Sequence, residues 1–197
     1  MATQSNSDIL SLSNHFLIAM PSLNDPNFEQ SVSYICEHNN EGAMGITINR
    51  PGNLTFADLC EQLNIEVDDE DIARQPVFEG GPVEVDRGFI LHTPIGEWES
   101  TLAVSRDIGL TMSQDIIEAI ASGCAIDSPP PEHFIISLGY AGWSKDQIED
   151  EIAENVWLNV PASMDILFHT PVEQRWTAAA AALGINLQTL SSDIGHA

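Results

Sequence analysis

Apolar and polar residues alternate at residues 31–36, in the first quarter of the chain. This period of two is typical of a half-buried strand, and residues 43–48 resemble its partner strand. Residues 38–42 between them are rich in turn-forming types, which favours a hairpin. A shorter apolar run at 15–20 ends at Pro21 and predicts a strand before this hairpin.

Further short apolar segments predict strands later in the chain. Residues 76–83 run into a Gly-Gly-Pro corner, and residues 156–160 end at Pro161. Residues 87–93 and 100–104 favour a second hairpin, which would turn near residues 94–96. With residues 134–136, we expect about eight strands.

Helical spacing and capping residues predict about four helices. Thr55 and Asp58 form a capping-box pattern at the start of one helix, and Gly123 follows a second helix at 113–122. Thr170 and Glu173 form the same pattern before an alanine-rich helix that extends to Leu183.

The fourth helix follows a glycine-rich segment that we expect to be a tight turn after the strand at 134–136. Gly139 and Gly142 would allow the turn, and Ser144 with Gln147 would cap the helix. Two interpretations of this turn stay open. The glycines permit a sharp corner and close packing, or backbone amides at the helix N-terminus bind an anion.

These elements predict an α+β fold, because strict alternation of strands and helices is missing. We expect one compact domain at residues 13–197, with a mixed or largely antiparallel, barrel-like sheet flanked by the helices. Residues 1–12 are polar, and we expect them to be disordered.

The net charge of −24 changes the expected partners. The six Lys and Arg residues are scattered, whereas nucleic-acid binding depends on clustered cations that neutralise phosphates. Direct DNA or RNA binding is therefore disfavoured. The acidity indicates either solubility or a basic protein partner.

Three further features of the sequence indicate a cytoplasmic protein. No apolar run approaches the roughly 20 residues that span a bilayer, and the polar start lacks the features of a signal peptide. The three cysteines match no disulfide or metal framework. We expect no membrane association.

The chain resembles the AlgH/YqgE family over nearly its whole length. The segments that carry this resemblance are HFLIAMPS at 15–22, CEHN at 36–39, GAMG at 42–45, NRP at 49–51, EGGPV at 79–83, DRGF at 86–89 with His92, SLGYAGW at 137–143, residues 147–158, and GHA at 195–197. The resemblance implies a compact bacterial α+β domain, described as a transcriptional regulator connected with alginate synthesis. It supplies no catalytic residue, cofactor or substrate.

Histidine and cysteine residues offer two enzymatic hypotheses. Cys36 and His38, with His92, could form a nucleophile and its base, because alternate residues of a strand share a face. A buried structural thiol is the simpler interpretation. His38, His92 and His169 could bind a metal, but their spacing matches no ligand motif. We predict no catalytic residue, cofactor or metal.

Arginines beside turn glycines offer a hypothesis of anion binding. Arg50 and Arg87 could pair with carboxylates of the fold, or they could clamp a small anionic ligand against glycine-rich corners. The candidate ligand site comprises Arg50, Gly80, Gly81, Arg87, His92, Gly139, Tyr140, Gly142 and Trp143. The preferred hypothesis is a non-enzymatic domain that acts through protein contacts, and a binder or enzyme of an anionic metabolite is the alternative.

Overall fold

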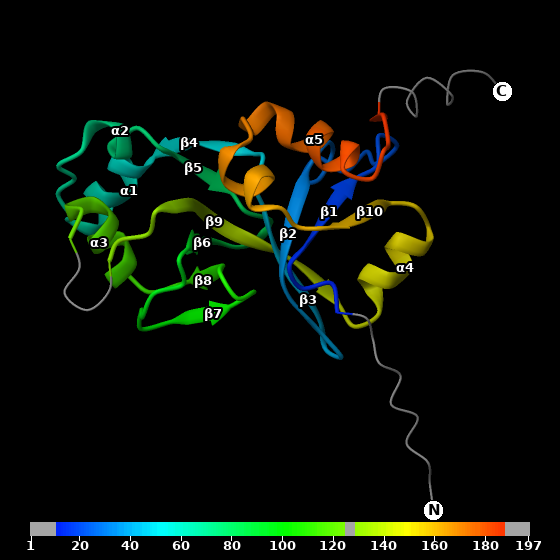
Figure 1. Cartoon of the computed structure of the whole chain (residues 1–197), viewed down its shortest axis with the longest axis horizontal. Coiled ribbons are helices and arrows are strands. Elements are labelled where there is room, and N and C mark those ends of the chain that lie inside the picture. Colours follow the sequence, from blue (N-terminus) through cyan, green and yellow to red (C-terminus); the bar gives the residue numbers. More distant parts are fainter. Residues whose placement is uncertain (1–10, 125–128, 188–197) are drawn as a thin grey trace, which may run out of the picture.

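The computed structural model describes residues 11–124 and 129–187 and contains an α+β domain (Figure 1). The strands of the described chain are β1 His15–Ala19, β2 Val32–Asn39, β3 Gly42–Thr47, β4 Pro51–Thr55, β5 Pro76–Glu79, β6 Val83–Thr93, β7 Thr101–Ala103, β8 Gly109–Thr111, β9 His133–Ser144 and β10 Trp157–Pro161. The helices are α1 Phe56–Leu63, α2 Glu70–Ala73, α3 Asp115–Ser122, α4 Gln147–Ala153, the π-helix Asp165–His169, the 3-10 helix Val172–Gln174 and α5 Arg175–Ala181.

One curled sheet connects all the strands, in the order β10-β1-β2-β3-β9-β6-β8-β7, with β5 and then β4 added beside β9. Pairing is antiparallel except between β5 and β9. The long strand β9 pairs with β3 at its C-terminal end, and its N-terminal half lies between β5 and β6. In Figure 1 it crosses the molecule from the side of α3 toward α4.

Both faces of the sheet are covered, which explains why several strands are apolar at consecutive positions. Phe16 and Ile18 of β1 join the largest core cluster, to which α5 and the π-helix contribute, whereas Leu17 enters a cluster with α4 on the opposite face. In β9, Ile135 belongs to the largest cluster and Ile136 packs with α1 and α3. Alternate residues therefore fill different cores.

The predicted α+β class, single domain and largely antiparallel sheet are confirmed, as is the hairpin of β2 and β3. The second predicted hairpin is wrong. Strand β8 lies between β6 and β7 and pairs with both. Its three residues, Gly109–Thr111, were too few to show a period in the sequence.

The predicted glycine turn is also wrong, because β9 continues through Gly139 and Gly142 to Ser144. Helix α4 starts at Gln147 after Asp146, which has a φ of 65° and makes no side-chain cap bond. Only half of the expected capping box is present, since the Gln147 side chain accepts a bond from the Ser144 amide. An anion site at a turn leading directly into a helix is therefore excluded.

The other helix ends gave mixed outcomes. The capping box of Thr55 and Asp58 is present, and Gly123 ends α3 with a φ of 64°. The capping box predicted at Thr170 is wrong, because its hydroxyl donates to the carbonyl of Asp165 and α5 begins only at Arg175.

The described chain begins at Ser11, and Leu12 is already buried beside α4. Residues 1–10, which make up most of the segment expected to be disordered, lie outside the described residues, as does the GHA ending. Within the described ranges, no helix is long and apolar enough to cross a membrane.

Candidate functional site

A hollow of about 420 Å³ lies between two bulged strands, β4 and β6. In β4, residues 52–54 stand opposite the single residue Val77 of β5. In β6, residues 84–87 stand opposite Gly139 of β9. Bulges redirect side chains and are frequent beside functional sites. The lining residues are Pro26, Asn27, Arg50, Gly52, Asn53, Leu54, Val77, Phe78, Glu79, Gly81, Pro82, Val85 and Leu138.

The β6 bulge carries an exposed apolar residue to the rim of the hollow. Glu84 opens the bulge with a φ of 48°, a conformation that non-glycine residues seldom adopt. Arg87, at the other end of the bulge, pairs with Glu84. Its guanidinium lies 2.9 Å from the Glu84 carboxylate and over the ring of Phe89. Val85 between them is 56% exposed, the largest exposed fraction among the large apolar residues described.

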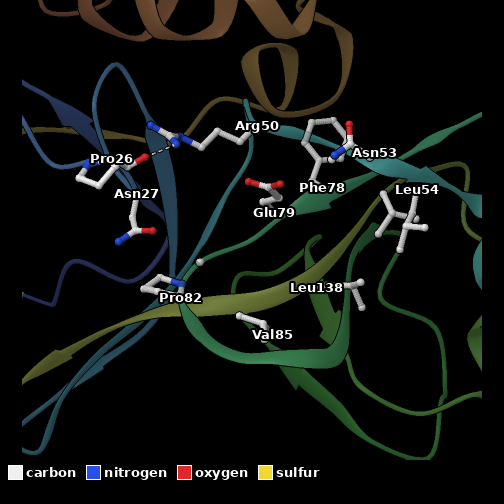
Figure 2. Close-up of a pocket in the computed structure, with 13 residues that line it drawn as sticks. Pro26, Asn27, Arg50, Asn53, Leu54, Phe78, Glu79, Pro82, Val85 and Leu138 are labelled. Carbon is white, nitrogen blue, oxygen red and sulfur yellow. Dashed lines mark hydrogen bonds between the residues drawn. The ribbon is translucent and has the colours of Figure 1, made fainter.

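Arg50 forms one wall of the hollow and holds the loop at residues 21–31. Its two terminal nitrogens each donate a 2.7 Å hydrogen bond, to the carbonyls of Pro26 and Glu29. Figure 2 shows the bond to Pro26. These bonds direct much of the guanidinium's donor capacity to the protein's own backbone, so Arg50 shapes the wall on which Pro26 and Asn27 lie.

Glu79 is the other charged residue of the lining, and it has no partner in the described chain. Its exposed carboxylate makes no hydrogen bond or ion pair with residues 11–124 or 129–187. In the view of Figure 2 it lies in the middle of the hollow, with Arg50 and Phe78 toward one side and Val85 and Leu138 toward the other. The hollow therefore combines a free negative charge with an apolar lining.

The two predicted glycine corners do lie together, and their backbones are in direct contact. A Cβ atom on Gly80 would lie 2.3 Å from the Gly139 carbonyl oxygen, and one on Gly81 would lie 2.2 Å from the Tyr140 carbonyl carbon. Gly139, with a φ of 71°, would place its Cβ 2.4 Å from the Gly81 oxygen. The glycines thus allow two backbone segments to touch beneath the β6 bulge.

The nine predicted site residues occupy several places. Arg50 and Gly81 line the hollow, whereas Arg87 lies on the outer bulge. Tyr140, Gly142 and Trp143 line a more open hollow of about 500 Å³ beside β3. Sequence reasoning missed Glu79, Phe78 and Val85; the signal available for Glu79 was its place directly before the Gly-Gly-Pro corner.

His92 is a buried structural residue and lies outside these hollows. Its Nδ1 is 2.9 Å from the Pro94 carbonyl, so Nδ1 donates and Nε2 accepts from the Thr111 hydroxyl at 2.8 Å. Burial lowers the pKa of His92 and favours this neutral form. Both ring nitrogens of His92 are therefore engaged by groups of the fold.

Cys36 and His38 do not share a face of the sheet as expected. A β-bulge at Cys36 shifts the register between Ile35 and Glu37, which reverses the alternation after it. Cys36 enters the largest core, where burial raises the pKa of its thiol, while His38 contacts Glu149 of α4 at 2.9 Å. A nucleophile and base pair is therefore absent at this position.

The three histidines considered for a metal site have separate partners. His38 contacts Glu149, His92 contacts Thr111, and His169 contacts His133. Over the described ranges, no group of three or more His, Cys, Asp and Glu side chains is arranged to hold a metal ion.

Comparison with solved structures supports this architecture. The solution structure of the AlgH protein from Pseudomonas aeruginosa matches with a TM-score of 0.76 and 45% identity, over 100% of both chains. A crystal structure of a protein from Corynebacterium diphtheriae matches with a TM-score of 0.69 over 88% of each chain. Its 17% identity limits that likeness to the fold.

Comparison with known sequences gives the family. A UPF0301 protein of Nitrosospira multiformis is 50% identical and covers 94% of this chain and 97% of its own. A UPF0301 protein of Thioalkalivibrio sulfidiphilus is 53% identical, with 93% and 96% covered. The family model described as AlgH-like, DUF179, matches residues 16–188. The chain therefore belongs to the AlgH-like family.

Proposed function

We propose that this chain is a non-enzymatic binding domain that acts through contact with a partner protein, and that the hollow between the β4 and β6 bulges is the contact site. The observation that carries this proposal is the free Glu79 carboxylate beside an apolar surface that includes exposed Val85. Contiguous exposed apolar surface on a folded protein frequently marks an interaction site.

The chemistry of the lining selects the kind of partner segment. An apolar side chain would pack on Phe78, Leu54 and Leu138, and a neighbouring lysine or arginine would pair with Glu79. The net charge of −24 would attract such a basic segment from a distance. The expected ligand is therefore a short segment with an apolar residue next to a cationic one.

The family description as a transcriptional regulator fits this proposal as an indirect role. Six scattered basic residues against thirty acidic ones supply no cationic surface for phosphates, so the regulated step would be reached through a protein. A cytoplasmic location belongs to the same proposal and is supported by the three free cysteines at 36, 60 and 124.

The alternative of an anionic metabolite has weaker support. The two glycine corners lie together, as that hypothesis requires. Their backbones touch each other directly, however, so the contact offers no space for a ligand between these glycines. Arg50 bonds two carbonyls, and Arg87 pairs with Glu84 outside the hollow. An anion in the hollow would also face the Glu79 carboxylate.

Selection from a random peptide library on the immobilised protein tests the proposed function. The wild type should enrich peptides that place Lys or Arg beside an apolar residue. Glu79→Gln and Val85→Asp should lose this enrichment, whereas Glu66→Gln, an equal change of charge at an exposed site elsewhere, should retain it. Enrichment of acidic peptides, or the same peptides on Glu79→Gln, would contradict the proposal.

A further inference from the structure

Two histidine side chains from distant parts of the chain meet at the surface where β9 begins. His133 is the first residue of β9, and His169 is the last residue of the π-helix, 36 positions later. Their Nε2 atoms lie 3.3 Å apart, and the ring centroids lie 4.6 Å apart at an interplanar angle of 81°. The side chain of His169 is 50% exposed, so an ion from solvent can reach the pair.

The contact between the two rings depends on a single proton. An imidazole nitrogen either donates or accepts, so one Nε2 carries a proton and the other presents a lone pair. When both rings carry their proton on Nδ1, two lone pairs face each other and require a cation between them. Neutral imidazoles in this second form are the ones that bind metal ions.

The distance between the two nitrogens matches the geometry of metal coordination. Zn²⁺ binds imidazole nitrogen at about 2.0–2.1 Å, so two such ligands at the tetrahedral angle lie about 3.3–3.4 Å apart. The Nε2 atoms of His133 and His169 already have this separation, at 3.3 Å. Small rotations of the rings are therefore enough for both nitrogens to share one ion.

The surroundings of the pair favour the metal-binding form. Phe168 stacks on His133, with ring centroids 6.0 Å apart and an angle of 26° between the rings. Asp165 Oδ1 lies 4.0 Å from Nδ1 of His169, and a carboxylate on this side favours a proton on Nδ1 and a free Nε2. Asp165 and His169 are the two ends of the π-helix, a rare element that is frequent at functional sites.

We propose that His133 and His169 bind one divalent first-row transition-metal ion, such as Zn²⁺, through their Nε2 atoms, with Asp165 orienting His169. Imidazole suits Zn²⁺, Ni²⁺ and Cu²⁺, whereas Mg²⁺ prefers oxygen ligands. Among the described residues, no third His, Cys, Asp or Glu side chain completes the site, so water would hold the remaining coordination positions. The ion should therefore exchange with solvent, unlike the ion of a closed structural zinc site.

Titration of the full, untagged chain with Zn²⁺, followed by NMR of the histidine ring nitrogens, tests the proposal. The Nε2 signals of His133 and His169 should shift together and saturate. The ring signals of His15, whose Nδ1 lies 3.1 Å from the Ser13 carbonyl, should stay. Mg²⁺ at the same concentration should leave all three rings unchanged, because it is attracted to the acidic surface and not to imidazole.

Substitutions separate coordination from general attraction of cations to this acidic chain. His133→Gln and His169→Gln should each weaken Zn²⁺ binding at least about tenfold, read from the ring that remains, since even outer-shell partners are worth about 10–100-fold. His15→Gln removes a histidine outside the pair and should leave the titration midpoint unchanged. The backbone NMR spectrum of each variant shows that its fold is intact.

Three results would each overturn the proposal. They are the lack of any shift at the two Nε2 atoms up to about 1 mM Zn²⁺, an equal response to Mg²⁺, and an unchanged midpoint at His133 in the variant His169→Gln. Neither histidine lines the hollow of Glu79, so these outcomes are independent of the peptide selection that tests the proposed function.

Discussion

Substitution of Gly139 by alanine tests whether the glycine corners are structural contacts. Gly139 lies beneath the β6 bulge, with a φ of 71°. An added Cβ would lie 2.4 Å from the oxygen of Gly81, 3.0 Å from the oxygen of Val83 and 3.3 Å from the Cα of Val85. All three are backbone atoms, so they cannot turn away as a flexible side chain could.

Two effects add to the loss of stability. An alanine in the left-handed region loses about 1–2 kcal/mol relative to its preferred conformation. Forcing the chain apart around the new methyl group costs about 1–3 kcal/mol more, as in overpacked cores. The total loss, about 2–5 kcal/mol, is a large part of the free energy of unfolding of a typical domain, which is about 5–15 kcal/mol.

Urea denaturation measures this loss directly. For a slope of about 2 kcal/mol per molar urea, a loss of 4 kcal/mol lowers the midpoint by about 2 M. Gly88→Ala is the matched control on β6, because its Cβ would meet no atom within 4 Å and its backbone lies outside the positive-φ region. A free energy of unfolding for Gly139→Ala within about 1 kcal/mol of wild type would refute the reasoning, since that is the average effect of any substitution.

Four further outcomes follow from buried groups and charge. Arg175→Met should lower the free energy of unfolding by about 2–4 kcal/mol in a urea melt, because two backbone carbonyls lose the hydrogen bonds of a buried guanidinium. Cys124 should react with a thiol reagent in the native protein, whereas Cys36 and Cys60 should react only on unfolding. Burial raises the pKa of Cys60 from 9.0 to about 11, so its contribution to stability should be complete below pH 9 and decline as pH rises through 11; Cys60→Ala should reduce that decline. Labelled duplex DNA should show no saturable submicromolar binding near 150 mM salt in fluorescence anisotropy.

Strands with a clear period were predictable from sequence, and strands defined only by their neighbours were not. The alternation in β2 and β3 and the proline after β1 and within β10 placed these elements well. Strand β8 is three residues long and exists because it pairs with both β6 and β7. Its position depends on tertiary contacts that no local pattern records.

The errors around β9 have a specific cause. Gly139 and Gly142 are typical of turns, but a glycine is equally required where two backbones touch. The segment that touches Gly139, at Gly80 and Gly81, is nearly 60 residues away in the sequence. Local reasoning identified the right residues and gave them the wrong structure.

The candidate site was less predictable than the fold, because bulges decide which side chains face it. Strict alternation would have placed Cys36 and His38 on the same face of the sheet. A single extra residue in β2 places them on opposite faces. In the same way, the position of Val85 depends on four residues of β6 opposite one of β9. Such a mismatch can be recognised only once both strands and their register are known.

The loop at residues 21–31 lines two hollows. Pro26 and Asn27 line the hollow of Glu79, whereas Leu23, Asp25 and Phe28 line a smaller hollow of about 340 Å³ near α4 and β10. Arg50 donates hydrogen bonds to the carbonyls of Pro26 and Glu29, so its guanidinium fixes this loop. The hollow of Glu79 then keeps a carboxylate that has no partner in the described chain beside an apolar lining, and an anion placed there would be repelled by that charge.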